Sequence, residues 1–251
     1  MKNLLKFEWR KLWQSKSLYI VFGVGLLCMV LSMVAFKMLS MTVSATASTL
    51  LALQSSNFIS LVGASLLSVF VTIFACADHS QHTIKNIYAR GYNRTAVYFS
   101  KYLISLLVTF MIAAIYMALN FVLALILGGE VGSMPAGFDW GDLALQFWVL
   151  FGLHSLYFGV SMIIGKMAGS LAVNLVGIGL FFVVLNAIIT IAKIDFDITE
   201  YELDYILMGL SGPLGIGFAQ KPDLLHALLV PAVYAVVFIT AGWLVNRRRD
   251  V

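Results

Sequence analysis

Six long runs of residues, nearly free of charged side chains, constrain the fold of this chain more than any other feature. The runs cover residues 18–36, 58–77, 102–127, 143–165, 171–192 and 224–245. Each has about 19 to 26 residues, and about 20 residues of α-helix cross the ~30 Å apolar core of a bilayer. Hydrophobic residues make up 61% of the chain and charged residues 11%, and the mean hydropathy is +0.95, outside the range of soluble domains. The sequence therefore predicts an all-α integral membrane protein, with six transmembrane helices in a single domain over residues 1–251.

The charged residues divide between the two sides that six spans create. All of the 16 Lys and Arg except Lys37, Lys193 and Lys221 fall on the side that holds both chain ends. Most acidic residues fall on the other side. Because loops rich in Lys and Arg stay in the cytoplasm, we expect both termini to be cytoplasmic. This topology explains the pI near 9.0, so the basic charge is no evidence for a nucleic-acid partner.

The basic segment between the second and third runs, residues 78–101, has local helix signals. Asp78, with a Gln three residues later, fits an N-cap with a capping box, which predicts a short helix over residues 79–90. Gly91 is suited to the left-handed conformation that ends a helix. Asn93 then fits the N-cap of a second helix that continues into the third run.

This segment resembles the first cytoplasmic loop of type-2 ATP-binding-cassette exporter permeases. The family pattern is an acidic residue, then Gly-Thr-Ile-Lys-Asn, then Gly-x-x-Arg and a Lys at the next span. The chain matches it at Asp78, Thr83, Lys85, Asn86, Gly91, Arg94 and Lys101, with His82 at the usual Gly position. The resemblance implies a coupling helix that docks on a separate ATPase subunit, through Asp78, Thr83, Lys85, Asn86, Arg90, Gly91 and Arg94. An ordinary basic cytoplasmic loop is the alternative.

Residues 1–17 have the pattern of an amphipathic helix. Leu5, Trp9, Leu12 and Trp13 recur at helical spacing, and the nearby basic residues lie largely off that stripe. The resemblance implies an interfacial elbow helix, with Trp9, Arg10 and Trp13 at the inner leaflet. A simple basic flank before the first span is the alternative.

The chain lacks the residues of an enzyme active site. No phosphate-binding loop is present, so ATP and Mg²⁺ are expected only in the partner subunit, and we expect no catalytic residues or cofactor in this chain. His79 and His82 lack further ligands at suitable spacing, so no metal site is expected. His154 lies in a predicted span, as do several Asn residues, and a functional and a structural role remain open for them.

Apolar side chains in the spans are candidates for a substrate pathway. Met and aromatic residues usually serve helix packing, but Met-rich walls also adapt to varied ligands. The candidates are Met29, Met33, Phe70, Phe74, Phe181 and Phe182. Between the last two spans, residues 193–223 are expected to form an external hairpin that dips partly into the membrane.

In its small size, the chain resembles the permeases of the bacitracin-resistance, lantibiotic-immunity and phenol-soluble-modulin exporter groups. This resemblance implies a bacterial cell-membrane exporter of amphipathic or antimicrobial peptides, surrounded by lipid and paired with a second copy or a close paralogue. The competing hypothesis is a membrane immunity or sensor protein that binds a peptide toxin without moving it.

Overall fold

The computed structural model describes residues 2–39, 48, 50, 64–80, 84–128, 139–191, 199–210 and 222–248. All regular secondary structure in these residues is helical. The elements are α1 (Lys2–Trp13), α2 (Lys16–Leu39), α4 (Ala64–Ser80), α5 (Ile84–Ala89), α6 (Arg94–Gly128), α7 (Trp140–Ile164), α8 (Met167–Ala172), the π-helix η3 (Val173–Gly177), α9 (Ile178–Ile191), the 3₁₀-helix η4 (Thr199–Tyr201), α10 (Leu203–Gly209) and α11 (Leu224–Arg248).

Within the described residues, five helices are long and apolar enough to cross a membrane. They are Lys16–Ala35, Arg94–Gly128, Trp140–Ile164, Met167–Ile189 and Leu224–Arg248. They confirm a multi-pass, all-helical membrane protein. The run at residues 58–77 corresponds to α4, whose apolar part, Ser65–Asp78, is shorter. Residues 58–63 lie outside the described part, so the sixth span stays a prediction.

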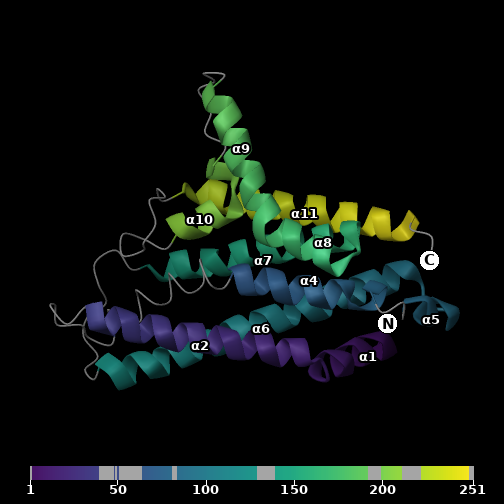
Figure 1. The fold of residues 1–251 in the computed structure, drawn as a ribbon, viewed down its shortest axis with the longest axis horizontal. Coiled ribbons are helices and arrows are strands. Elements are labelled where there is room, and N and C mark those ends of the chain that lie inside the picture. Colours follow the sequence, from purple (N-terminus) through teal and green to yellow (C-terminus); the bar gives the residue numbers. More distant parts are fainter. Residues whose placement is uncertain are drawn as a thin grey trace.

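The long helices α2, α4, α6, α7 and α11 run side by side along the long axis of the molecule (Figure 1). Both chain termini and the short helix α5 lie at one end of this bundle, which we call the terminal end. Helix α9 projects away from the bundle, and many of its apolar side chains are exposed (Figure 1). The terminal end therefore gathers elements that are far apart in sequence.

Helices α7 and α11 pack closely, because glycines let their backbones approach. A Cβ atom at Gly152 would lie 2.7 Å from the Cβ of Pro231. A Cβ atom at Gly159 would lie 2.4 Å from the carbonyl oxygen of Phe238. Small residues of this kind are typical of helix contacts in membranes, where close packing replaces the hydrophobic effect.

Hydrogen bonds between buried side chains join α4 to α7 and η3. The Asn174 Nδ2 atom donates to Thr72 Oγ1 at 2.7 Å and to Ser161 Oγ at 3.0 Å. It also donates to the Tyr157 carbonyl at 3.2 Å. Because polar groups in a bilayer have no water to bond, such contacts fix which helix faces meet.

The predicted helix over residues 79–90 is wrong in its bounds. Helix α4 continues to Ser80 and α5 begins only at Ile84, so Asp78 lies inside a helix and does not cap one. Lysines from two other helices hold the Asp78 side chain instead. Two other local predictions are confirmed: Gly91 has φ 83°, and Asn93 Oδ1 accepts from the Thr95 backbone N–H at 3.1 Å before α6.

The described part of the predicted external hairpin contains α10, which packs beside α7 and α11. Leu203, Ile206 and Leu207 are almost fully buried. The Tyr234 hydroxyl on α11 donates to the Tyr201 carbonyl at 3.1 Å. This contact holds the segment against the side of the bundle, while residues 193–198 and 211–221 lie outside the described part.

Candidate functional site

Four charged side chains meet inside the terminal end of the bundle, and we call them the ionic cluster: Glu8 and Lys11 from α1, Asp78 from α4 and Lys101 from α6. Asp78 forms ion pairs with both Lys11 and Lys101. Asp78 and Lys101 are each only 1% exposed. One carboxylate therefore ties three helices together.

Glu8 is the unusual member of the ionic cluster. It is 0% exposed, and neither of its carboxylate oxygens accepts a hydrogen bond in the part of the chain that the structure describes. Burial raises the pKa of Glu8, although the nearby positive charge of Lys101 acts in the opposite direction. A buried carboxylate without donors is costly when ionised, so Glu8 is a group whose charge responds to its surroundings.

The apolar side of α5 is anchored in the bundle. Ile84 is 5% exposed and Ile87 is 8% exposed. Ile87 packs in a cluster with Leu4 of α1 and Val97 of α6. A six-residue helix has little stability of its own, so these tertiary contacts are what hold it in place.

A second set of contacts ties α5 and α6 to α11. The Arg94 guanidinium lies over the Tyr88 ring, 5.4 Å from its centroid, and Arg94 Nη1 donates to the Arg247 carbonyl at 3.3 Å. The Tyr88 side chain also hydrogen-bonds Asn246. Movement of α5 is thus coupled by direct contact to both chain termini.

The outward side of α5 and its following turn is basic and exposed. Lys85, Arg90 and Gly91 are exposed, and Tyr92 is 38% exposed beside them. We call Lys85, Arg90, Gly91 and Tyr92 the basic surface. It offers two cations and one aromatic ring on α5 and the turn after it, and the other side of α5 is packed in the bundle. Such a surface suits contact with another protein.

The structure separates the residues expected to contact an ATPase into two groups. Lys85, Arg90 and Gly91 lie at the surface, whereas Asp78 is buried in the ionic cluster. Arg94 is half-buried against Tyr88 and α11. Thr83 and the Asn86 side chain lie outside the described residues.

The N-terminal helix is present, with a different buried face from the one expected. Leu4, Glu8 and Leu12 are nearly fully buried, while Trp13 is 45% exposed. Trp9 is half-buried and packs edge-on against Trp13, and Arg10 is exposed. Glu8 was missed by the sequence analysis, although it lies four residues from both Leu4 and Leu12 and so on their helix face.

The structure does not bring the candidate pathway residues together. Met29 and Met33 are buried where α2 meets α6, and Phe70 and Phe74 stack on α4 with centroids 6.2 Å apart. On α9, Phe181 is 60% exposed and Phe182 is 7% exposed. The Lys101 ammonium lies 5.9 Å from the Phe74 ring centroid, so Phe74 belongs to the surroundings of the ionic cluster.

His154 has partners for both ring nitrogens. Ser105 Oγ lies 3.1 Å from Nε2 and Thr109 Oγ1 lies 3.1 Å from Nδ1. The ring is fully buried, and these contacts join α6 to α7. This arrangement favours the structural role over the functional one.

Among the described residues, no group of three or more His, Cys, Asp or Glu side chains could hold a metal ion. The His79 side chain and His82 lie outside that part of the chain. The ionic cluster has two carboxylates, but two ammonium groups lie beside them. Its ion pairs hold α1, α4 and α6 together.

Comparison with known proteins assigns the family. No curated protein sequence matches the chain. A sequence model of the ABC-2 family of transporter proteins matches residues 4–186, a stretch that includes most of α1, the ionic cluster and the basic surface. Since this match covers most of the chain, the chain belongs to the ABC-2 transporter family and is a permease subunit of an ATP-binding-cassette transporter.

Proposed function

We propose that the chain is the membrane subunit of an exporter that moves amphipathic or antimicrobial peptides out of the cell or its membrane. A separate subunit binds and hydrolyses ATP with Mg²⁺ and docks on the basic surface. Two permease copies, or one copy and a close paralogue, form the transport unit in a bacterial cell membrane, with both chain termini in the cytoplasm. The contrast between the two sides of α5 carries this proposal.

One side of α5 is packed in the bundle, and the other side is exposed. The side formed by Ile84 and Ile87 is packed in the bundle, and Tyr88 and Arg94 connect α5 to α11. The opposite side presents Lys85 and Arg90 to the surroundings. A partner that moves this surface moves α1, α6 and α11 with it, because packed helices transmit displacement as stiff bodies.

The ionic cluster extends the same connection to α4. Asp78 links α4 to α1 and α6 through its two lysine partners. Helix α6, with 35 residues, runs the length of the bundle, and α4, with 17 residues, lies beside part of it (Figure 1). A push at the terminal end therefore reaches the opposite end through α6.

The peptide cargo is inferred from the apolar character of the bundle. The exposed faces of α2, α6 and α9 are built from large apolar side chains. A cargo that enters from the bilayer needs no charged path, and an amphipathic peptide meets that condition. The resemblance to small peptide-exporter permeases supports the same class.

Charge reversal on the basic surface tests the docking step. The double variant Lys85→Glu, Arg90→Glu is expected to lose the ATPase subunit when the tagged chain is purified from its native membrane. Arg248→Glu is the matched control, because Arg248 is also exposed at the terminal end but lies on α11. The measurement is the amount of ATPase subunit per permease by quantitative mass spectrometry.

The competing function is a non-transporting immunity or sensor protein. It predicts that a peptide toxin binds the unaltered chain while no ATPase subunit co-purifies with it. ATPase activity that rises on addition of an amphipathic peptide supports the exporter. Equal recovery of the ATPase with the double variant and with Arg248→Glu would refute docking at the basic surface.

A further inference from the structure

The segment formed by η4 and α10 reaches deep into the side of the bundle. The Tyr201 carbonyl accepts its hydrogen bond from Tyr234, which lies ten residues after the start of α11, or about 15 Å along that helix. At the other end of the segment, Gln146 Nε2 on α7 donates to the Leu210 carbonyl at 3.1 Å. Gln146 lies only six residues after the start of α7. The segment therefore extends from well inside two membrane-spanning helices towards the end of the bundle where both begin (Figure 1).

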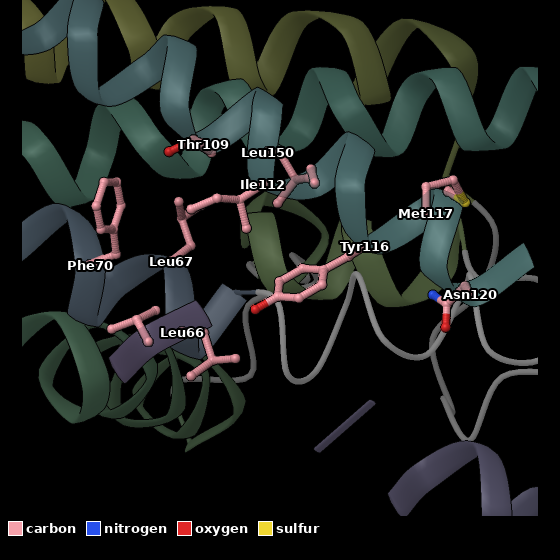
Figure 2. A pocket seen from close by; sticks show the side chains of 11 residues that line it. Leu66, Leu67, Phe70, Thr109, Ile112, Tyr116, Met117, Asn120 and Leu150 are labelled. Atoms are coloured by element: carbon pink, nitrogen blue, oxygen red, sulfur yellow. The ribbon is translucent and has the colours of Figure 1, made fainter. Parts of the chain in front are cut away.

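One side of α10 belongs to the apolar core of the bundle. Leu203, Ile206 and Leu207 are at most 2% exposed. They pack in the same cluster as Phe70 and Leu150. Those two side chains line the apolar pocket between α2, α4, α6 and α7 (Figure 2). The surroundings of α10 are thus largely apolar.

Two carboxyl groups accompany these apolar side chains. Glu202 directly precedes α10 and is half-buried. Asp204 lies in the first turn of α10, and its buried Oδ1 atom accepts no hydrogen bond from the residues that the structure describes. Neither carboxyl forms an ion pair with a described Lys, Arg or His, in contrast to Asp78 with its two lysine partners. A carboxylate taken from water without a cation beside it is costly, so ionisation of Glu202 or Asp204 opposes the packing of α10.

The groups that face the two carboxyls are tyrosine hydroxyls, Tyr157 from α7 and Tyr234 from α11. The other titratable groups in this half of the packed elements are Asp142 of α7, Glu200 and Tyr201 of η4, Tyr205 of α10 and His226 of α11. Of these, only His226 can carry a positive charge. Its ring packs against the Tyr201 ring, with centroids 5.0 Å apart.

The proton affinities of the two carboxyls agree with this environment. Burial raises the pKa of Asp204 to about 6. Burial, followed by the nearby charge of Asp204, raises the pKa of Glu202 to about 7. Packed α10 therefore binds protons more tightly than α10 in water does. The stability that the two carboxyls contribute to packing is present below their ordinary pKa values and is lost as the pH rises through about 6 to 7.

We propose that Glu202 and Asp204 form a proton-dependent latch: α10 stays packed against α7 and α11 while both carboxyls are protonated, and it leaves this position when they ionise. On release, each carboxyl gives its proton to water and becomes a hydrated carboxylate. The hydrogen bonds from Tyr234 and Gln146 and the apolar contacts of α10 do not change with pH in this range. The two carboxyls are therefore what makes the position of α10 depend on pH.

Release of α10 has a consequence for a groove on the side of the bundle. Tyr234, which bonds the Tyr201 carbonyl, lines the apolar groove between α9 and α11. Phe181 and Phe182, two of the candidate pathway residues, line the same groove. Loss of the hydrogen bond frees the Tyr234 ring to turn and so changes the groove. This consequence rests on the proposed function, because only an exporter uses the groove as a pathway, whereas the latch itself does not.

Distances between nitroxide spin labels test the latch on the purified permease in detergent. In a chain with Cys28 and Cys76 replaced by Ser, labels at Tyr205→Cys on α10 and Arg248→Cys at the end of α11 report the position of α10. Labels at Trp140→Cys on α7 and Arg248→Cys report on the bundle, because both residues are exposed. Samples are frozen between pH 5 and pH 9 and measured by double electron–electron resonance. The first pair is expected to show a second population of distances, whose ratio to the first population rises about tenfold or more from pH 5 to pH 8, while the second pair stays constant.

Three variants identify the titrating groups. Glu202→Gln combined with Asp204→Asn is expected to keep α10 packed at every pH, because neither side chain can then ionise. Glu200→Gln is the matched control, since Glu200 is an exposed carboxyl two residues before Glu202, and it is expected to keep the pH dependence. His226→Gln is also expected to keep it.

Each result decides for or against the latch. A pH dependence that Glu200→Gln and His226→Gln retain and the double variant loses supports it. A single population of distances from pH 5 to pH 9, or a pH dependence that survives the double variant, overturns it. Loss of the pH dependence in His226→Gln assigns the titration to the imidazole and overturns it as well. Because the labels report on the permease alone, the result stands whether or not an ATPase subunit docks on the basic surface.

Discussion

At the scale of single residues, the ionic cluster shows how burial changes the effect of a charged side chain on stability. Taking Asp78 and Lys101 out of water is expensive, and their mutual attraction compensates only while both partners remain. Removal of one partner leaves an uncompensated buried charge. The cluster is therefore sensitive to single substitutions and tolerant of paired ones.

Asp78→Asn is expected to destabilise the permease by about 3 kcal/mol, because both Lys11 and Lys101 lose their carboxylate partner. Adding Lys101→Met to Asp78→Asn is expected to recover most of that loss, since the fully buried ammonium is then gone. The measurement is the free energy of unfolding in detergent for both single variants and the double variant. Asp223→Asn is the control, because Asp223 is exposed. Additive effects of the two cluster substitutions would show that the pair is not coupled.

Glu8→Gln is expected to remove a pH dependence of stability. Since the pKa of Glu8 is raised in the folded protein, the fold binds a proton more tightly than the unfolded chain does. The stability that this carboxyl contributes is present below its ordinary pKa and is lost as the pH rises through the raised value. The unaltered protein should therefore lose thermal stability relative to Glu8→Gln as the pH increases. Parallel stability curves for the two proteins across that range would contradict the assignment.

At the scale of elements, the sequence predicted what depends on local chemistry. The apolar runs predicted the long helices because a bilayer requires a fixed helix length, and the left-handed Gly91 and the Asn93 cap depend only on nearby backbone. The break between α4 and α5 was misplaced, because lysines on α1 and α6 hold Asp78. Glu8 was missed for a similar reason: its charged neighbours Asp78 and Lys101 come from other helices.

Helix packing between α7 and α11 gives an element-scale prediction. Gly159→Ala is expected to destabilise the protein by about 1–3 kcal/mol, because the added methyl group would lie 2.4 Å from the backbone oxygen of Phe238. Gly179→Ala on α9 is the matched control. No atom lies within 4 Å of a Cβ there, so the higher helix propensity of Ala should leave stability unchanged or slightly raised. The measurement is thermal unfolding in detergent, and equal effects of the two substitutions would argue against a tight α7–α11 contact.

At the scale of the whole molecule, the terminal end brings together α1, α5 and the end of α11 (Figure 1). An ATPase subunit that binds there would act on several helices at one place. The distribution of Lys and Arg predicted that these elements share a side. It could not predict their contacts, such as Arg94 with the Arg247 carbonyl, because those depend on how the helices pack. The proposed mechanism needs both features: α1, α5 and the end of α11 lie on one side, and α5 contacts the other two there.

The sidedness itself can be tested with a pair of single cysteines. In a chain with Cys28 and Cys76 replaced by Ser, Lys85→Cys probes the basic surface, and Asp223→Cys probes the exposed residue before α11 at the opposite end. With a membrane-impermeant maleimide, Asp223→Cys should react in intact cells and Lys85→Cys only in inverted vesicles. This reciprocal pattern follows because α11 separates the two ends by about 37 Å of helix, enough to cross the bilayer. Labelling of Lys85→Cys from outside intact cells would place the basic surface away from any cytoplasmic ATPase, and docking there would then be impossible.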